Sequence, residues 1–240
     1  MESNNRVVLV TGPTGGLGAA VVRAFADEGA RLVLTSRKCE ELEALASELI
    51  LDADRALLVP ADVTNVEQVQ ALVQAAHARF GAIDAAIHVS GGYRAGTSVP
   101  DTDLEAWNFM LNLNLTSAFI VARAVLPGML ERRSGKLVFI SSRADSQPAA
   151  NQAAYAVSKG ALEVFVRNLA EETRAHGVNV NAVSPSIIDT PTNRKGIPHA
   201  DFSAWVQPES LAGVIRFLAS DAARDIHGAI VPCTARRSST

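Results

Sequence analysis

The stretch RVVLVTGPTGGLGAAVVRAF, residues 6–25, decides the fold of this chain. Its apolar first part predicts a buried strand, and its last part has the apolar spacing of a helix. Between them, Gly12, Gly16 and Gly18 permit a tight turn, a close backbone approach and contact between helix and strand. The helix would point its N-terminus at a phosphate group, so the stretch indicates nucleotide binding.

The glycine spacing is G-x-x-x-G-x-G, which differs from the common dinucleotide pattern G-x-G-x-x-G. A glycine-rich turn can also simply link a strand to a helix. Because this one follows the first strand of a β-α-β unit, the nucleotide-binding interpretation is favoured.

The same alternation continues to the end of the chain. Six further short apolar runs predict strands, at 31–37, 56–62, 85–91, 136–142, 179–185 and 228–233. Stretches with helical periodicity separate them, including long ones at 103–131 and 154–176. Strict alternation requires crossovers, so we predict an α/β fold in which one doubly wound parallel sheet of about seven strands carries helices on both faces. Residues 1–240 are expected to form a single domain.

Composition excludes several functional classes. The 240 residues include 48% hydrophobic and 20% charged residues, and the net charge is −3, which gives no basic footprint for nucleic acid. Cys39 and Cys233 form no motif and suggest a reducing compartment. The charged N-terminus predicts no signal peptide, and no apolar run reaches the ~20 residues of a membrane span. We therefore expect a cytoplasmic enzyme without a bound metal.

Functional side chains collect where the predicted strands end. In a parallel sheet these ends share one edge, and ligands bind there. The residues at this edge are Gly12, Ser36, Arg37, Asp62, Ser90, Gly91, Ser141, Ser142 and Pro185. The one long irregular segment, 186–208, follows the sixth strand, and a loop of that length is usually functional. We expect it to cover a substrate.

The stretch YAVSKGALEVF, residues 155–165, puts a phenol and an ammonium on one helical stripe, at Tyr155 and Lys159. A phenol has a pKa near 10, so acid–base work at neutral pH requires that pKa to fall. The ammonium and a nearby oxidised nicotinamide would both favour the phenolate. The alternative is a buried-edge tyrosine followed by a solvated lysine. Ser142 could bind a substrate carbonyl, and the Asn114 amide could hold a water that links Lys159 to solvent.

Together these motifs resemble the short-chain dehydrogenase/reductase family over essentially the whole chain. The resemblance rests on TGPTGGLG, ADVT, LNLNLTSAF, FISS, YAVSK and NAVSPSIIDT, in that order. It implies a Rossmann fold and a catalytic set of Asn114, Ser142, Tyr155 and Lys159. Asp62 would face the adenine and Thr190 the nicotinamide carboxamide. The cofactor-binding residues that it implies are Gly12, Thr14, Gly15, Gly16, Leu17, Gly18, Ser36, Arg37, Asp62, Val63, Ser90, Gly91, Tyr155, Lys159, Pro185, Ile188 and Thr190.

The chain departs from the family pattern at three places. Asn-Asn-Ala-Gly is replaced by His88-Val89-Ser90-Gly91, with the loss of one amide contact and a histidine that we expect to be packed in its strand. Pro-Gly is replaced by Pro185-Ser186, and the C-terminal Asp-Gly-Gly is absent. The 186–208 loop and SGGY, residues 90–93, resemble dihydropteridine reductases. Tyr93 and Arg143 are candidate substrate residues; the alternative is that they are exposed side chains near a cleft.

The second strand bears on cofactor choice. Enzymes that prefer NAD place an acid at its end, where this chain has Ser36 followed by Arg37 and Lys38. A serine and a guanidinium can bind a 2′-phosphate, so we expect NADP(H), with NAD(H) as the alternative.

The leading hypothesis is an NADPH-dependent oxidoreductase that acts on a small carbonyl or alcohol. One alternative is reduction of a quinonoid pterin or related conjugated imine. A second, of another class, is a nucleotide-binding sensor or scaffold without catalysis. No nucleic-acid or membrane partner is expected. Apolar residues on the two long helices, such as Phe109 and Phe165, predict a homodimer or homotetramer.

Overall fold

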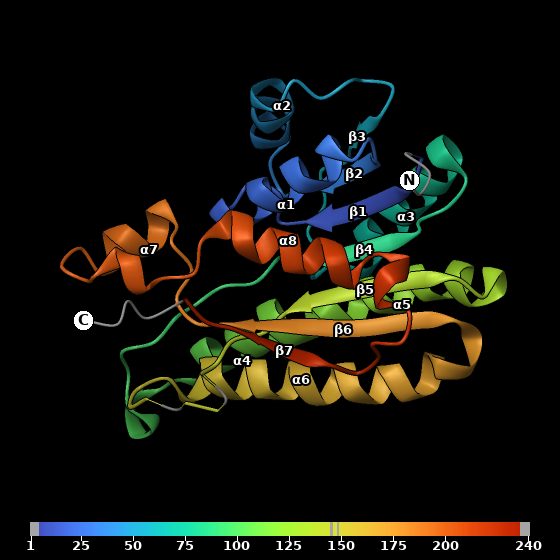
Figure 1. Ribbon diagram of the computed structural model, residues 1–240. Helices are drawn as coiled ribbons and strands as arrows, with labels where there is room; N and C mark the ends of the chain where they lie inside the picture. Colours follow the sequence, from blue (N-terminus) through green and yellow to red (C-terminus); the bar gives the residue numbers. More distant parts are fainter. Residues whose placement is uncertain (1–4, 145, 148, 236–240) are drawn as a thin grey trace.

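The computed structural model describes residues 5–144, 146–147 and 149–235. These contain one seven-stranded sheet in the order β3-β2-β1-β4-β5-β6-β7, with every pair parallel and helices on both faces (Figure 1). The strands are β1 (Val7–Thr11), β2 (Arg31–Thr35), β3 (Ala56–Leu58), β4 (Ala85–His88), β5 (Gly135–Ile140), β6 (Val178–Pro185) and β7 (Ile230–Cys233). The predicted doubly wound α/β fold is therefore confirmed.

Two layers of helices bury the two faces of this sheet. Side chains alternate along a strand, so Val8 and Val10 of β1 face one layer while Val7 and Leu9 face the other. The first layer holds α1 (Gly16–Asp27), α2 (Cys39–Glu48) and α8 (Pro208–Leu218). The second layer holds α3 (Val66–Phe80), α5 (Ser117–Arg132) and α6 (Ala153–Thr173).

The path of the chain creates a crevice beside β1. From β1 the chain runs outward through β2 and β3, and it then returns to form β4 on the other side of β1. Helices that follow these strands leave in opposite directions, so the carboxyl ends of β1 and β4 are left uncovered between them. Gly12 follows β1 and Ser90 follows β4 closely, which puts both at this crevice.

The long helix predicted at 103–131 contains an irregularity. It consists of α4 (Leu104–Leu111), a π-helical turn (Asn112–Thr116) and α5, which run on without a break. By length and composition alone, Leu104–Arg132 could cross a membrane. Its buried residues Val121, Val125 and Met129 instead pack in the core against the sheet, so it is a core helix of this fold.

Two local predictions were wrong. The segment 186–208 is not wholly irregular, because α7 (Pro191–Gly196) and a 3-10 turn (Phe202–Ala204) lie within it. Thr190 starts α7 by accepting a hydrogen bond from Asn193 N, which explains how so short a helix forms. The place of Gly135 just past a predicted helix also favours a left-handed helix cap there. Gly135 is instead a strand residue, and the left-handed conformation belongs to Arg133, at φ 53°.

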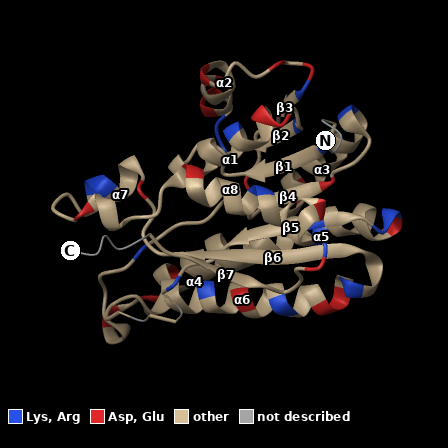
Figure 2. Cartoon of the chain, in the orientation of Figure 1, with Lys and Arg blue, Asp and Glu red and all other residues tan. Residues whose placement is uncertain are grey.

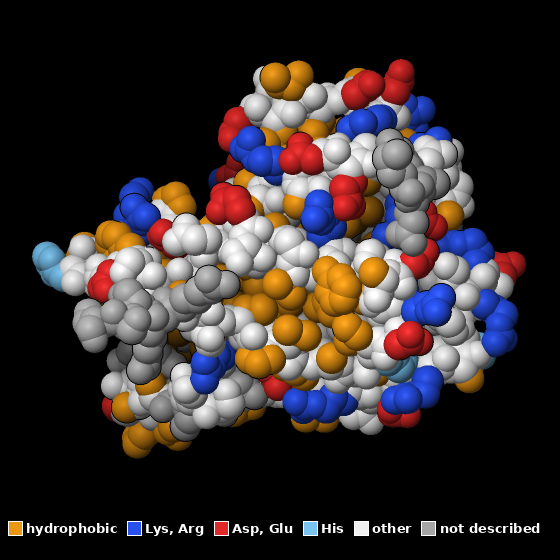
Figure 3. Space-filling view, in the orientation of Figure 1, with side chains coloured by type: hydrophobic (Ala, Val, Ile, Leu, Met, Phe, Trp, Pro, Cys, Tyr) orange, Lys and Arg blue, Asp and Glu red, His pale blue; other side chains and the backbone are white. Residues whose placement is uncertain are grey.

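Charged and apolar side chains are distributed differently over the surface. Figure 2 shows Lys, Arg, Asp and Glu mostly on helices and loops, with both signs close together. Figure 3 shows apolar side chains gathered over α8 and the neighbouring strands β6 and β7. Phe217 of α8 is 45% exposed, and Phe119 of α5 and Val164 of α6 are 48% and 55% exposed. Apolar surface of this kind is typical of faces that meet another protein.

Candidate active site

The glycine turn after β1 is shaped by close backbone approaches. Gly12 has φ +64°, and a Cβ on it would lie 2.9 Å from Ser90 N. A Cβ on Gly18 would lie 2.1 Å from Gly12 O, because the first turn of α1 packs directly on the loop. Both positions therefore require glycine, and they bring the backbones of β1, β4 and α1 together at the crevice.

The N-terminus of α1 faces this crevice without a side-chain cap. Its N-cap is Gly15, which has an extended backbone and no side chain to accept from the first-turn N–H groups. Gly15, Gly16 and Leu17 all line the cavity. Unpaired N–H groups and the helix dipole make such a terminus an anion site, and the bare glycines leave room for a phosphate.

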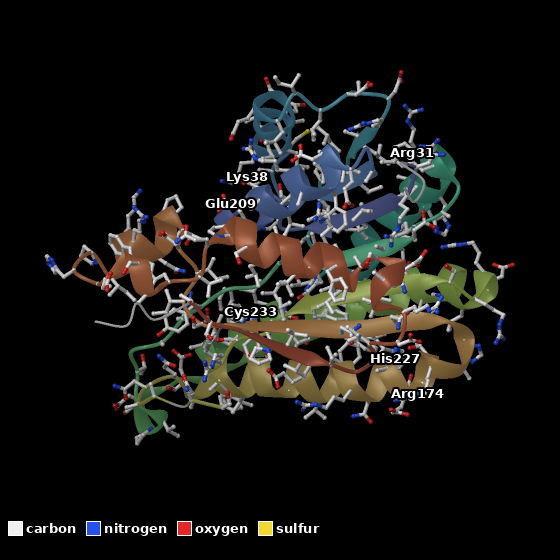
Figure 4. The ribbon with its side chains drawn as sticks, viewed as in Figure 1. Arg31, Lys38, Arg174, Glu209, His227 and Cys233 are labelled. Carbon is white, nitrogen blue, oxygen red and sulfur yellow. The ribbon has the colours of Figure 1, made fainter. Side chains whose placement is uncertain are left out.

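Beyond β2, the cavity is lined by a small charged cluster. Ser36 Oγ donates to Lys38 O over 3.0 Å, and Lys38 Nζ lies 2.7 Å from a carboxylate oxygen of Glu41. Figure 4 labels Lys38 on the side of the molecule where α1 begins. The guanidinium of Arg37 is exposed and makes no hydrogen bond or ion pair with any described residue.

Glu41 is a site residue that sequence reasoning missed. Its carboxylate lines the cavity and accepts from Thr14 Oγ1 over 3.4 Å. The hydrogen bond from Lys38 holds the pKa of Glu41 below its usual range, so the group is ionised at neutral pH. Its position four residues past Arg37, in the first turn of α2, was the available signal.

Asp62 and Val63 follow β3 and line the same end of the cavity. The Asp62 carboxylate accepts from both the N–H and the hydroxyl of Thr64, over 2.9 and 2.7 Å. These hydrogen bonds hold the pKa of Asp62 below its usual range. A fixed, ionised carboxylate beside an apolar valine is suited to the amino edge and the ring face of a purine.

Tyr155, Ser142 and Lys159 meet at the centre of the cavity. Tyr155 and Lys159 are one turn apart on α6, and the Ser142 hydroxyl is hydrogen-bonded to the Tyr155 phenol. Lys159 is 5% exposed, and its ammonium donates to Ile140 O over 2.8 Å. Burial lowers the pKa of Lys159 to about 8, which leaves the ammonium mainly protonated at neutral pH.

The pKa of Tyr155 differs from the sequence expectation. Lys159 was expected to lower it, but burial raises the pKa of Tyr155 and outweighs the opposing hydrogen bond from Ser142. Tyr93 packs its ring edge-on against Tyr155, with centroids 4.8 Å apart, and adds to the increase. The phenol is therefore protonated at neutral pH, which is the form that can donate a proton.

Asn114 lies just behind the cavity in the π-helical turn and is 1% exposed. Its amide nitrogen donates to Gly92 O and Ser158 Oγ, over 3.1 and 3.0 Å, and its oxygen accepts from Gly92 N over 2.9 Å. Both amide hydrogens are thus used. Only the second lone pair of the amide oxygen is left for the water that was expected to link Lys159 to solvent. The role that the hydrogen bonds of Asn114 support is to hold the backbone of Gly92 in place.

His88 is packed in its strand as predicted, and it forms the middle of a buried polar chain. Ser117 donates to Leu113 O over 2.6 Å, so it accepts from His88 Nε2–H at 3.1 Å. His88 Nδ1 then accepts from Thr11 Oγ1 at 3.0 Å, and Thr11 accepts from Ser90 N at 3.2 Å. Burial lowers the pKa of His88 to about 3, so the ring stays neutral. The chain ties the cofactor edge to the π-helical turn.

Pro185, Ile188 and Thr190 line the cavity from the segment after β6. A Cβ on Gly16 would lie 2.8 Å from the Thr190 methyl group, so this segment touches the glycine turn. Arg194 in α7 holds the carboxylate of Asp189 with its guanidinium, one pair of atoms being 2.7 Å apart. The ion pair and the α7 N-cap hold this segment in place beside the glycine turn.

All of the sequence-predicted site residues except Asn114 line one cavity of about 1040 Å³, which also takes in Tyr93 and Arg143. A Cβ on Gly91 would lie 2.9 Å from Asn114 Oδ1 and 3.3 Å from Lys159 Nζ, so the glycine lets the chain after β4 approach both side chains. The described residues include no cluster of three or more acids, histidines or cysteines that could hold a metal. The arrangement can bind a nucleotide and transfer a proton.

Comparisons with known proteins agree with this geometry. Residues 6–200 match the short chain dehydrogenase family. An uncharacterized oxidoreductase of Staphylococcus aureus (strain USA300) is 32% identical over 209 residues, which cover 84% of this chain and 89% of that protein. The 3-oxoacyl-[acyl-carrier-protein] reductase of a Synechocystis strain is 34% identical over 224 residues, covering 91% and 90% of the two chains.

Solved structures have the same fold. The crystal structure of gox2181 superimposes with a TM-score of 0.89 at 32% identity and covers 95% of this chain and 94% of its own. Levodione reductase gives a TM-score of 0.88 at 29% identity, with 95% and 96% covered. The likeness of the 186–208 loop to dihydropteridine reductases stays a prediction.

Proposed function

This chain belongs to the short chain dehydrogenase family, whose members are oxidoreductases, and from that premise we propose that it transfers hydride between NADP(H) and a small carbonyl or alcohol substrate. Tyr155 is the acid–base group in this proposal, and Ser142, Lys159 and Asn114 support it. Residues 1–240 act as one domain in the cytoplasm, with 186–208 covering the substrate.

The observation that carries the proposal is the triangle of Tyr155, Ser142 and Lys159 inside the glycine-lined cavity. The phenol, the hydroxyl and the ammonium come from two elements, α6 and the end of β5, that pack on each other. A protein that only binds a nucleotide needs no buried ammonium one turn from a half-buried phenol. Burying an ammonium costs folding free energy, and the non-catalytic alternative gives no reason for that cost.

The residues of the cavity fit a nicotinamide dinucleotide. The bare N-terminus of α1 would hold the pyrophosphate, and Asp62 with Val63 would hold the adenine. Lys159 would bind the nicotinamide ribose, and Thr190 the carboxamide. When bound in reduced form, the nicotinamide would supply the hydride.

In the reducing direction, Tyr155 gives its proton to the carbonyl oxygen of the substrate. The raised pKa of Tyr155 keeps this proton in place until the oxygen becomes basic. Ser142 donates to the same oxygen and orients it. The Lys159 ammonium lies one turn from the phenolate that is left and stabilises its charge. Asn114 positions Gly92 and, through Ser158, the turn of α6 that contains Tyr155, since Ser158 Oγ donates to Tyr155 O over 2.7 Å.

The preference for NADP(H) rests on Arg37. Lys38 is paired with Glu41, whereas the Arg37 guanidinium makes no hydrogen bond or ion pair with a described residue and is available to a 2′-phosphate, although it is close enough to Glu41 and Asp62 to help lower the pKa of both. Glu41 opposes this, since an ionised carboxylate in the cavity repels a phosphate and favours a ribose hydroxyl. Pairing with Lys38 reduces that repulsion. NAD(H) remains the alternative.

The test of the proposed function is Tyr155→Phe, with Tyr93→Phe as its control. The first variant removes the proton donor and keeps the ring, so turnover should fall by about 10²–10⁴-fold. The second removes the only other tyrosine hydroxyl, which accepts from Gln152 Nε2 over 3.0 Å, and should keep turnover within a few-fold. NADPH oxidation is followed by absorbance with a panel of diketones, quinones, oxo acids and pterins.

Cofactor binding is measured in parallel by NADPH fluorescence and should change by no more than a few-fold in both variants. A Tyr155→Phe rate above about half of the unmodified rate would refute the mechanism. Cofactor binding without turnover of any compound would favour the sensor. Turnover of pterins alone would favour the pterin alternative.

A further inference from the structure

Among the described residues that line the cavity, Arg143 is the one with a charge that the proposed function does not use. It follows Ser142 directly and lines the cavity. No hydrogen bond or ion pair joins its guanidinium to any residue within the described ranges 5–144, 146–147 and 149–235. Resting on the proposed function, we infer that Arg143 binds a carboxylate of the substrate, so that the enzyme acts on small oxo acids and the corresponding hydroxy acids.

The backbone fixes Arg143 beside the reaction centre. Its N–H donates to Pro185 O over 3.2 Å, and its carbonyl accepts from Gln147 N over 2.8 Å. Ala144 N donates to Ser142 Oγ over 3.2 Å and closes a turn around Arg143. Neighbouring Cα atoms are about 3.8 Å apart, so this guanidinium is tethered one residue from the hydroxyl that orients the carbonyl. An anionic group that it binds must lie within a few bonds of that carbonyl.

Charge balance in the cavity points to an anion at this end. The described carboxylates that line it are Glu41 and Asp62, which follow β2 and β3. Arg143 follows β5, and in the sheet β5 lies three strand spacings from β2, or about 14 Å. That exceeds the screening length of about 8–10 Å at moderate salt. Neither carboxylate therefore neutralises Arg143.

The other groups at this end suit a small molecule with a single charge. Gln147 and Gln152 are uncharged, and Leu113, Ile187 and Ile197 supply apolar walls. A guanidinium has only donors, and a carboxylate has only acceptors, so the two pair in bidentate fashion. A pterin ring offers donors of its own and no charge, which makes it a poorer partner for Arg143.

The experiment measures binding of two matched pairs, pyruvate with pyruvamide and acetoacetate with acetoacetamide. Each amide has the shape of its acid and lacks the charge. Calorimetric titration uses the full chain saturated with NADP⁺, so that no hydride is available and binding is read without turnover. In the unmodified protein, at least one acid should bind about tenfold to a hundredfold more tightly than its amide.

Arg143→Gln should abolish this preference while the Kd of the amide stays within about twofold. Arg94→Gln is the matched control. Arg94 is an exposed arginine whose guanidinium lies 4.5 Å from the ring centroid of Phe109, and it does not line the cavity. This variant should keep the preference. Arg143→Lys should keep part of it, because the charge remains and the bidentate contact is lost. Equal melting temperatures of the three variants would show that folding is unaffected.

Three results would overturn the inference: neither acid binding more tightly than its amide, a preference that survives Arg143→Gln, or one that Arg94→Gln removes equally. The outcome is separable from that of the proposed function. If the acids bind more tightly than their amides but no compound is turned over, the proposed function is refuted and the carboxylate site is still supported. Turnover of neutral carbonyls with no acid preference would do the reverse.

Discussion

Replacing Lys159 by methionine should make the protein more stable and inactive at the same time. Lys159 is 5% exposed, and within the described part of the chain its ammonium has one hydrogen bond, to Ile140 O. Methionine fills a similar apolar volume without a charge, so the substitution removes a buried cation and opens little space. It also removes the group that stabilises the Tyr155 phenolate.

The size of the gain follows from the pKa of Lys159. Burial lowers that pKa from 10.5 to about 8, and each pKa unit is worth about 1.4 kcal/mol, so holding the ammonium in the fold costs about 3 kcal/mol. Loss of the hydrogen bond to Ile140 O takes back about 1 kcal/mol. A net gain of about 2 kcal/mol remains. In a chain of this size it should raise the melting temperature by about 4–8 °C.

The pH dependence gives the sharper check. Between about pH 8 and pH 10.5 the unfolded chain carries the lysine proton and the folded chain does not, so the stability of the unmodified protein rises with pH. The advantage of Lys159→Met should be complete below about pH 8 and should disappear as the pH rises toward 10.5. Urea unfolding followed by tryptophan fluorescence, without added nucleotide, measures it at both ends.

Lys195→Met is the matched control, because Lys195 is an exposed lysine in α7. It should change the free energy of unfolding by no more than about 0.5 kcal/mol at either pH. A Lys159→Met protein that is less stable than the unmodified one near pH 7, or equally more stable at both pH values, would refute the reasoning.

Three further predictions concern the cofactor and the assembly. The kcat/KM of the unmodified enzyme on one substrate should be about tenfold to a hundredfold higher with NADPH than with NADH. Arg37→Ala should erase most of this cofactor preference, and Ser36→Asp should reverse the preference. Equal kcat/KM values for the two cofactors in the unmodified enzyme would contradict the proposal. Glu41→Gln should increase the NADPH preference by removing a carboxylate from the cavity, and an unchanged ratio would show that Lys38 already neutralises it. Light scattering should give the mass of a dimer or tetramer, because Phe119 and Val164 leave α5 and α6 with exposed apolar surface; a mass near 25.3 kDa would reject it.

The sequence predicts the sheet well because its strands are continuous apolar runs bounded by glycines and polar residues. A run such as RVVLV has few other stable environments than a buried parallel strand. The Tyr155–Lys159 spacing likewise fixes two side chains on one stripe of α6, whatever surrounds them. These signals are local, so they can be interpreted without knowing which other segments pack against them.

The misses share a different cause, namely contacts between distant segments. The pKa of Tyr155 depends on how deeply the ring is buried and on Tyr93, which lies 62 residues earlier in the chain. Glu41 enters the cavity because the bend after Arg37 turns α2 toward Thr14. The two bonds between the Asn114 side chain and Gly92 depend on the approach of the π-helical turn to the end of β4. The periodicity and spacing of residues along the sequence do not predict such contacts between distant segments.

The buried chain through His88 has a consequence for how this protein can change in evolution. An apolar residue at 88 would leave the Thr11 hydroxyl proton without an acceptor and Ser117 without the donor it now receives. Replacing Thr11 and Ser117 as well would remove both of these unpaired groups, but it would also take the acceptor from Ser90 N and one donor from Leu113 O. Positions 11, 88 and 117 should therefore show epistasis, because a second substitution costs less once the first has removed its hydrogen-bond partner. Among close relatives of this chain, the three residues should be inherited as one set or exchanged as one set.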